Sequence, residues 1–335
     1  MKSLSDMARP EGRGERDIAG FLLDVSFAAL LTGILIFSAL KFEPAISSGP
    51  RQHTGSILIA VLTPIVSLLS LSLLERLTPP AGPRKSIRRW LLHLQINIFV
   101  LFMLGLVGAL FATVPSALAR HFGINLGLID LRFAGEKGLW SALGAIWVSN
   151  AIVSDFFFYW LHRAQHKFPF LWQHHKMHHM DRELDAVTYA RQNWLEAFLI
   201  VFLIIVPGSI LFKTDTIDPW TLGVTGGIVS VIFVILLQME HANLRIQTGR
   251  ASVLWCTPQV HRIHHSRLPH HRDKNFASLF PLWDVLFGTY YAPARDEFPP
   301  TGVDGETEIQ SFWESLVFTP REWWRMYRAW LHRPA

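Results

Sequence analysis

Histidines gather in three short segments of the chain, and their spacing is the feature most able to support chemistry. "LHRAQH" places His162 and His166 four residues apart, and two later segments each carry an HxxHH pattern. Those patterns are formed by His175, His178 and His179 and by His261, His264 and His265. Residues three or four apart share one face of a helix, and neutral imidazole is the commonest metal ligand in proteins. The spacing therefore predicts metal binding.

The number of histidines indicates more than one metal ion. A catalytic zinc site uses three protein ligands and a structural zinc site uses four, so eight clustered histidines exceed a single site. They suit two metal ions that share a core. His241, in "EHANLR", is a ninth candidate because it leaves the last apolar segment at the same level as the other histidines.

The remaining histidines lack this spacing. His174, His270 and His271 adjoin the patterns but break the spacing, and we expect none of them to be a ligand. The isolated histidines are expected to be ordinary polar or surface residues: His53, His93, His121 and His332.

Carboxylates are scarce within the three segments, which predicts a nearly all-nitrogen ligand set. Asp155 lies seven residues before His162 and so on the same helical face. We expect its carboxylate to orient a metal-bound imidazole through the second ring nitrogen. The alternative is a polar residue that faces a cavity within the membrane.

Long apolar segments predict a membrane protein. Half of the 335 residues are hydrophobic and 17% are charged, against about 25% charged residues in soluble domains. Six segments approach the roughly 20 residues that cross a bilayer; they cover residues 18–40, 57–77, 90–114, 139–161, 195–212 and 220–237. The fifth contains Pro207 and Gly208, so a broken hairpin arm is the alternative there. A soluble protein with long buried helices is the alternative for the whole chain.

Basic residues predict the orientation. Lysine and arginine precede the first apolar segment and recur at residues 84–89, between the second and third. By the positive-inside rule both stretches are cytoplasmic, and counting segments forward brings all three histidine groups to that side. The net charge of +5 is modest and lies in tails and loops, so we expect no nucleic-acid partner. The single cysteine, Cys256, excludes an internal disulfide and a CxxC pair.

These observations predict an all-α fold, in which an integral membrane helical bundle carries a helical, histidine-rich, two-metal domain on its cytoplasmic side. Residues 1–138 form an N-terminal transmembrane region of about three spans. Residues 139–291 form the histidine-bearing region with a transmembrane hairpin. Residues 292–335 form a tail whose "ESLVFTPREWWRMYRAWLHR" predicts an amphipathic helix, at the membrane interface or packed on the cytoplasmic domain.

The chain resembles the fatty acid hydroxylase/sterol desaturase superfamily at "DFFFYWLHRAQH", "LWQHHKMHH", "EHANLR", "HRIHHS" and "DKNFASLFPLWDVLFGTYY". The resemblance spans residues 155–291 in the family's order. It implies a membrane di-iron oxygenase in which the nine histidines named above hold two iron ions. It also implies that Asn275 supports the site through hydrogen bonds. Two departures are "NFAS", where a glycine often follows the aromatic residue, and the additional His174.

The function that the resemblance implies is O2-dependent hydroxylation or desaturation of a lipid. Sterol, fatty acyl, sphingoid base, ether lipid and carotenoid substrates all stay open. The sequence contains no flavin or dinucleotide signature and no cysteine set for an iron–sulfur cluster. We therefore expect a separate electron donor, a ferredoxin or small cytochrome with its reductase. The location would be the inner membrane of a bacterium or the endoplasmic reticulum of a eukaryote.

Two other functions are compatible with clustered histidines. A membrane zinc hydrolase would need a carboxylate base beside its metal-bound water, and none of the three histidine segments contains an internal glutamate. An electron carrier with bis-histidine haem would need paired histidines deep within facing spans, whereas these histidines lie at span ends and beyond.

Overall fold

The computed structural model describes residues 53–111, 114–123, 127–131, 138–213, 217 and 219–332. This part of the chain is mostly helical, which confirms the all-α prediction apart from one pair of two-residue strands. The longer helices are α2 (His53–Leu77), α3 (Ile87–Phe111), α4 (Val114–Phe122), α6 (Leu139–Lys167), α7 (Pro169–His179), α10 (Pro219–His241) and α13 (Phe312–Leu331). The shorter elements are α8 (Glu196–Ile200), α9 (Val206–Leu211), α11 (Pro258–His264), α12 (Leu282–Leu286), β1 (Ile129–Asp130) and β2 (Phe212–Lys213).

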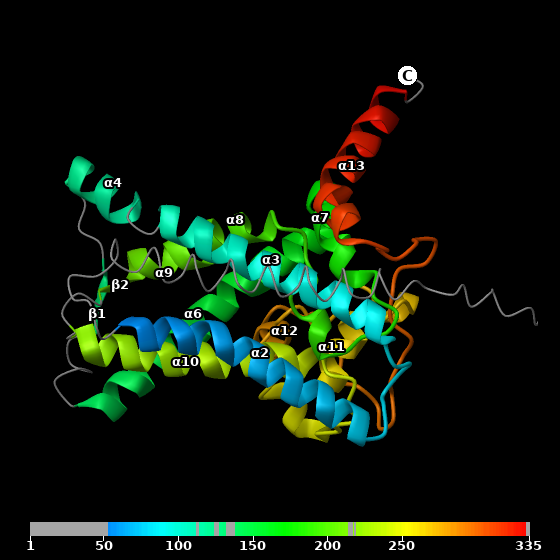
Figure 1. Ribbon diagram of the computed structural model, residues 1–335, viewed down its shortest axis with the longest axis horizontal. Coiled ribbons are helices and arrows are strands. Elements are labelled where there is room, and N and C mark those ends of the chain that lie inside the picture. Colours follow the sequence, from blue (N-terminus) through cyan, green and yellow to red (C-terminus); the bar gives the residue numbers. More distant parts are fainter. Residues whose placement is uncertain are drawn as a thin grey trace, which may run out of the picture.

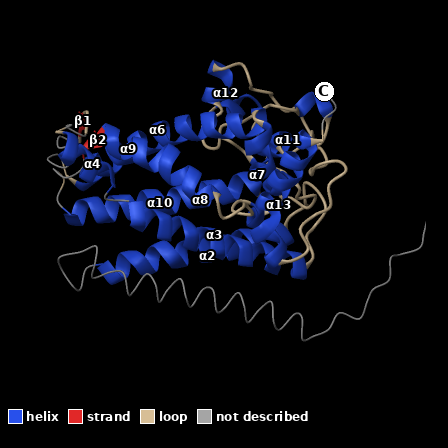
Figure 2. Ribbon diagram, turned by 90° about the horizontal axis from the view of Figure 1, so that it is seen from above, coloured by secondary structure: helices blue, strands red, loops and turns tan. Residues whose placement is uncertain are grey.

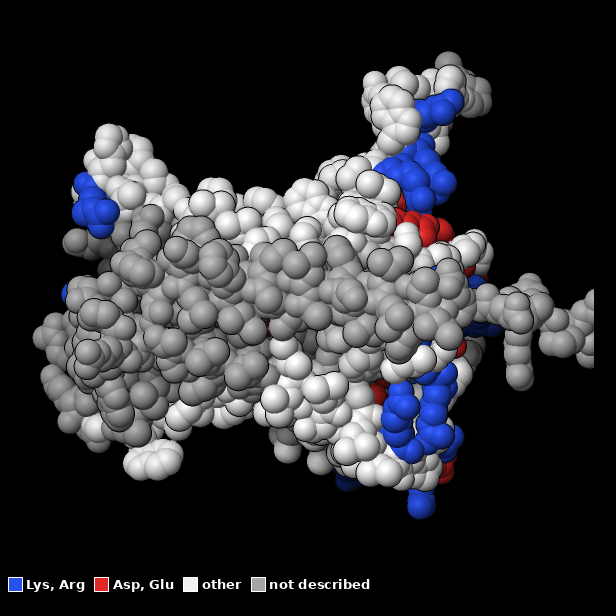
Figure 3. Space-filling view, in the orientation of Figure 1, with Lys and Arg blue, Asp and Glu red and all other residues white. Residues whose placement is uncertain are grey.

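Four long helices, α2, α3, α6 and α10, run lengthwise beside one another (Figures 1 and 2). The parallel strands β1 and β2 and the helix α4 lie at one end of this bundle. The helices α7, α11 and α12 and most of the loops lie at the other end. Charged side chains gather at that second end in the view of Figure 3. The bundle therefore separates an apolar body from a polar end.

Four long helices, α2, α3, α6 and α10, coincide with four of the six predicted apolar segments; the segment 18–40 lies outside the described residues. The fifth segment is interrupted, because a π-helical turn, Val201–Ile205, separates α8 from α9. Among the described residues, only α3 is long and apolar enough to cross a membrane, with a mean hydropathy of 2.3. That α3 and the other segments cross a membrane stays a prediction.

A proline sets the corner between α6 and α7. The residue before a proline is driven toward extended backbone, and Phe168 has φ −97° and ψ 120°. Pro169 then occupies the first turn of α7, where its missing N–H costs nothing. The corner turns the chain back on itself, so that the histidines of α7 face those at the end of α6.

Side-chain caps begin two further helices. The Thr257 hydroxyl accepts a hydrogen bond from the Val260 N–H at the start of α11, and Pro258 follows it. The Ser311 hydroxyl does the same with the Glu314 N–H at the start of α13. Such caps satisfy N–H groups that have no partner within the helix, so both helices begin where the sequence offers a capping residue.

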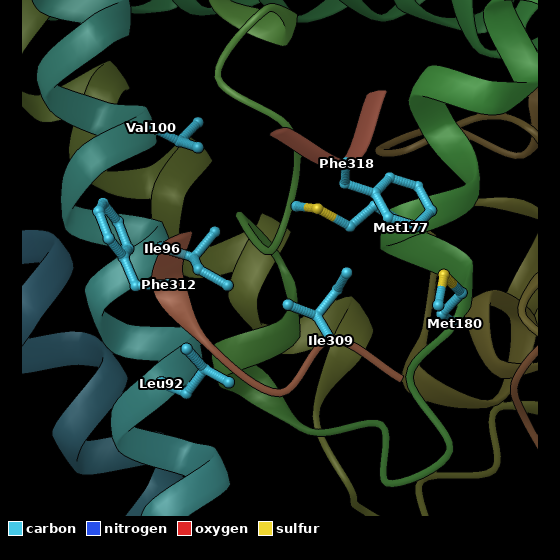
Figure 4. Packing of buried hydrophobic residues seen from close by; sticks show 8 residues of the cluster. All are labelled: Leu92, Ile96, Val100, Met177, Met180, Ile309, Phe312 and Phe318. Atoms are coloured by element: carbon cyan, nitrogen blue, oxygen red, sulfur yellow. The ribbon is translucent and has the colours of Figure 1, made fainter. Parts of the chain in front are cut away.

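An apolar core joins α13 to the bundle and to α7. Figure 4 shows Leu92, Ile96 and Val100 of α3 facing the side chains of Met177 and Phe318. The other members of this cluster are Met180, Ile309 and Phe312. The cluster fixes the position of α7 between a long bundle helix and the C-terminal helix.

A buried ion network ties the α2–α3 connection to the loop that follows α7. Lys85 Nζ donates to carboxylate oxygens of Asp181 at 2.8 Å and of Asp185 at 2.6 Å. Unpaired buried charges are costly, so these groups hold the two loops together. The basic stretch 84–89 therefore lies at the same end of the bundle as α7.

Candidate metal centre

The structure brings the nine predicted histidines together in two buried groups. The five-histidine cluster consists of His162, His166, His175, His179 and His264. The four-histidine cluster consists of His178, His241, His261 and His265. Within each cluster the candidate ligand atoms lie within 4.8 Å of one another. The rings come from α6, α7, α10 and α11 and the residue after it, so the centre exists only in the folded bundle.

Each HxxHH pattern divides between the clusters. His175 and His179, one helical turn apart, contribute to the five-histidine cluster, whereas His178 contributes to the other. In α11 the order is reversed: His261 and the following His265 join the four-histidine cluster, and His264 joins the five-histidine cluster. The two groups are adjacent, since the rings of His179 and His265 stack with centroids 4.4 Å apart.

The ring nitrogens approach one another more closely than hydrogen bonding explains. The Nε2 atom of His179 lies 3.1 Å from the Nε2 atoms of His166, His175 and His264. A neutral imidazole carries only one N–H proton, so these contacts cannot all be hydrogen bonds. In the four-histidine cluster the Nε2 atoms of His241 and His261 are 2.9 Å apart. A shared ion would satisfy these lone pairs.

The nitrogen spacing also bears on the geometry of such an ion. Imidazole nitrogens bind zinc at about 2.0–2.1 Å, so ligands at right angles would be about 3.0 Å apart and tetrahedral ones about 3.4 Å apart. The Nε2–Nε2 contacts across the two clusters are 2.9–3.2 Å. These distances bring the nitrogens close enough to share a metal ion.

Backbone carbonyls fix the orientation of three rings. The Nδ1 atoms of His162, His241 and His264 lie 2.7, 2.8 and 2.9 Å from the carbonyl oxygens of Phe276, Leu237 and Lys274. A carbonyl oxygen only accepts, so Nδ1 carries the proton and donates it, which leaves the Nε2 lone pair free. The Nε2 atom of His162 is buried and has no hydrogen-bond partner. A buried nitrogen whose lone pair has no hydrogen-bond partner is available to bind a metal ion.

Burial keeps the imidazoles of α7 and α11 neutral. Desolvation lowers the pKa of His179 well below its usual value, and the neighbouring His265 lowers it further. Desolvation likewise lowers the pKa of His264 to about 4, against the opposing effect of its hydrogen bond to Lys274. Because only the neutral ring offers a lone pair to a metal, these rings are prepared for binding at neutral pH.

Asp155 differs from the sequence-based expectation. Its Oδ1 accepts from the backbone N–H groups of Ser278 and Leu279 at 3.1 and 2.9 Å, and its Oδ2 accepts from Phe280 N–H at 2.8 Å. No imidazole is among these partners. The carboxylate instead holds the loop that carries Phe276. Because the Phe276 carbonyl orients His162, the carboxylate affects the position of that ring indirectly.

Asn275 makes the supporting hydrogen bonds that the resemblance implies. Its side-chain N–H2 donates to the carbonyls of Val260 and Tyr291, and its side-chain oxygen accepts from Tyr291 N–H. It is fully buried and has φ +57°, a left-handed conformation that asparagine tolerates better than most residues. It therefore closes the loop after His271 onto α11.

Two acidic residues near the centre were missed by the sequence analysis. Asp284 accepts from Phe276 N–H and Ala277 N–H at 2.8 and 2.9 Å and so holds the same loop as Asp155. Glu240 Oε1 lies 4.0 Å from His261 Nε2. Asp284 stands in the quoted "LWDVLFG" and Glu240 in "EHANLR", but neither has a spacing that reveals its partner.

The remaining histidines lie outside both clusters. His174 Nε2 lies 2.5 Å from a carboxylate oxygen of Glu196, which also accepts from Gln165. His271 Nε2 lies 3.1 Å from Glu297 Oε1, and the exposed His270 is beside it. His93 contacts Lys85. None of them belongs to either cluster. His270 and His271 form a separate group with Glu297 that could hold a metal ion, so the expectation that they are not ligands stays a prediction.

Comparison with known proteins identifies the family of the histidine-bearing region. The family model for fatty acid hydroxylases matches residues 147–289, which include all nine clustered histidines. Residues 147–289 belong to the fatty acid hydroxylase family. No solved structure matches the chain.

Relatives of this fatty acid hydroxylase region share about a quarter of their aligned residues with it. The chain is 27% identical to the ornithine lipid hydroxylase of Rhizobium tropici over 159 residues, 48% of this chain and 46% of the relative. It is 27% identical to the alkylglycerol monooxygenase of Danio rerio over 241 residues, 71% of this chain and 50% of the relative. It is 27% identical to a very-long-chain aldehyde decarbonylase of Arabidopsis thaliana over 180 residues, 50% of this chain and 27% of the relative. The matches thus span half of each relative or less.

Proposed function

We propose that this chain is a membrane-embedded lipid oxygenase in which the nine clustered histidines hold two iron ions. The convergence of nine Nε2 atoms into two adjacent buried groups carries the proposal. Two of the similar proteins are named as a lipid hydroxylase and a monooxygenase, which supports oxidative chemistry on a lipid. Hydroxylation and desaturation both stay within the proposal, as do sterol, fatty acyl and sphingoid substrates.

Bound iron would supply O2 activation, and the residues of this chain would prepare the site for it. The carbonyls of Phe276, Leu237 and Lys274 hold three rings with Nε2 directed into the clusters. Asp155 and Asp284 hold the loop that carries the Phe276 carbonyl. Burial excludes water from eight of the nine rings; only His166 is partly exposed.

A lipid would approach along the apolar wall of α6, as the aromatic run at residues 156–160 suggests. Phe158 is half-buried, and its ring centroid lies 5.3 Å from that of His162. Phe156 packs against Trp283 and Phe287, so it contributes to packing more than to a substrate path. Phe158 is therefore the member of this run that we assign to the substrate wall.

We propose that the chain crosses the membrane several times, with the histidine clusters on the cytoplasmic side. The contact between Lys85 and Asp181 supports this topology, because it joins the basic stretch 84–89 to the loop after α7. Electrons would reach the site from a separate ferredoxin or small cytochrome with its reductase. The regions 1–138, 139–291 and 292–335 would then serve as membrane region, catalytic region and tail.

The alternative functions make different demands on this geometry. The Nε2 atoms contact one another at about 3.1 Å, which leaves no room for a porphyrin between paired histidines. A zinc hydrolase needs a carboxylate base near its metal, and Glu240 lies close enough to be considered. The identity of the metal and the need for O2 separate that function from the oxygenase.

Metal analysis joined to lipid mass spectrometry tests the proposal. Wild type purified from cells grown with ⁵⁷Fe should contain iron, with a Mössbauer spectrum of two coupled ions. Cells that express it should accumulate a lipid changed by one oxygen or two hydrogens. His178→Ala should abolish that product, whereas His270→Ala, outside both clusters, should retain it. Zinc at full occupancy with a product formed without O2 would establish the hydrolase instead.

A further inference from the structure

The C-terminal helix α13 carries an apolar stripe that none of the described residues covers. Val317, Trp324, Tyr327 and Leu331 follow one another at intervals of seven, three and four residues, which places them on one face of a helix. Their side chains are 48–59% exposed. A contiguous apolar surface of this kind marks an interaction site on a folded protein.

The opposite face of α13 is anchored to the histidine-bearing end of the bundle. Phe318 and Thr319 are buried, and Glu322 Oε2 accepts from Lys176 Nζ at 2.9 Å. Trp323 stacks on Phe170 with ring centroids 4.2 Å apart and donates to its carbonyl. The helix is therefore fixed to α7 by one face, which leaves the apolar stripe directed away from that contact.

The C-terminal part of α13 projects from the body of the protein, transverse to the long helices of the bundle (Figures 1 and 2). If the long helices cross a membrane, an element transverse to them runs along the plane of the membrane. The projection begins at α7, at the end of the bundle where the charged side chains gather. This is the depth at which apolar spans give way to polar loops.

The residue types of α13 match that depth. Tryptophan and tyrosine are enriched at membrane–water interfaces, and the stripe contains one of each, Trp324 and Tyr327. Arg321, Arg325 and Arg328 lie about 60–120° around the helix from the stripe; Arg321 and Arg325 also contact Glu322. Guanidinium groups in this position reach phosphate oxygens while the aromatic rings enter the acyl boundary.

We propose that α13 lies in the phospholipid headgroup layer of the membrane that holds the bundle, with its aromatic stripe inserted and its arginines on the phosphates. The inference rests on the membrane embedding proposed above and on nothing about the metal or the reaction. Through Lys176 and Phe170, the inserted helix then fixes α7, and with it three histidines of the centre, at a set distance from the lipid surface.

Spin labelling of the full chain in phospholipid vesicles tests this placement. Nitroxides are attached in separate samples at Trp324→Cys and Tyr327→Cys on the stripe and at Ala329→Cys on the far side. The native Cys256 is buried, and unlabelled wild type controls for its reaction. We expect the ratio of accessibility to O2 over accessibility to a water-soluble nickel complex to be several-fold higher at the stripe than at Ala329.

A fourth label separates failure of this inference from failure of the membrane proposal. Leu110→Cys, on the exposed face of α3, should be accessible to O2 and shielded from nickel. A lipid signal at Leu110 with equal nickel accessibility at Trp324 and Ala329 would overturn the inference alone. Low accessibility at Trp324 to both reagents, with spectral broadening that unlabelled protein dilutes away, would overturn it in favour of a second copy of the chain.

Discussion

His178 and His179 are neighbours in the chain, yet their Nε2 atoms belong to different clusters. His179 Nε2 lies 3.1 Å from His264 Nε2, whereas His178 Nε2 lies 3.2 Å from His241 Nε2. Adjacent residues on a helix point about 100° apart, so one turn of α7 can supply both groups. The same division of α11 makes each of these two helices a contributor to both proposed metal positions.

Removing His178 should reduce the metal content of the four-histidine cluster more than removing His179 reduces that of the five-histidine cluster. His178→Ala leaves three imidazoles in its cluster, and His179→Ala leaves four in the other. Since a catalytic ion is held by about three protein ligands, His178→Ala leaves no imidazole to spare whereas His179→Ala leaves one, and we expect His178→Ala to lose the larger share of one metal ion per chain. Plasma mass spectrometry of the purified variants measures this, with the exposed His121→Ala, outside every candidate metal group, as the matched control. Equal loss of both ions from either variant would contradict two separable positions.

Asp155→Asn should destabilise the fold and loosen His162. The carboxylate accepts three backbone N–H groups, and an amide would turn a donor toward one of them. Hydrogen bonds to charged groups contribute about 1.5–3 kcal/mol, so we expect a loss of about that size in thermal or denaturant unfolding. The exposed Asp296→Asn is the control. If Asp155→Asn keeps both the stability and the metal content of wild type, the loop does not depend on this carboxylate.

Two substitutions of Asn275 can distinguish the cost of its left-handed backbone from the loss of its side-chain hydrogen bonds. Asn275→Gly and Asn275→Ala both remove the bonds to Val260 and Tyr291. Only alanine adds the cost of a left-handed conformation at φ +57°, about 1 kcal/mol or more for a residue with a Cβ. We therefore expect unfolding free energies in the order wild type, Asn275→Gly, Asn275→Ala. Equal stability of the two variants would show that the loop relaxes its backbone.

The anchor of α13 should weaken in acid. Burial would raise the pKa of Glu322, but hydrogen bonding to Lys176 and the charges of Lys176 and Arg325 outweigh it and hold the pKa below its usual value of 4.5. A group with a lowered folded-state pKa contributes stability above its unfolded pKa and loses that contribution as pH falls through the folded value. Wild type should therefore lose stability below about pH 4.5.

Glu322→Gln isolates that contribution. The variant keeps the size of the side chain but cannot form the ion pair with Lys176. The difference in unfolding midpoint between wild type and Glu322→Gln should be largest near neutral pH and should shrink as the pH falls from 4.5. A difference that stays constant as the pH falls from neutral through 4.5 would exclude the ion pairs of Glu322 with Lys176 and Arg325 as its source.

The sequence by itself determined the helices and the identity of the histidines. Apolar segments of about 20 residues leave few alternatives to helices, and α2, α3, α6 and α10 lie where those segments predict them. Spacings of three and four place His175, His178 and His179 within one turn of a helix, a local property that needs no tertiary contact. The same helical spacing predicted that His174 lies outside the metal centre, and its ring contacts Glu196 instead.

Only the tertiary structure decided how these residues combine. His178 meets His241 across 63 positions of sequence, and Asp155 meets Ser278 across 123. No local spacing encodes such pairs, because they depend on the corner at Pro169 and on the packing of α10 and α11 against α7. For the same reason the sequence suggested an imidazole partner for Asp155, whereas the fold presents it with three backbone N–H groups.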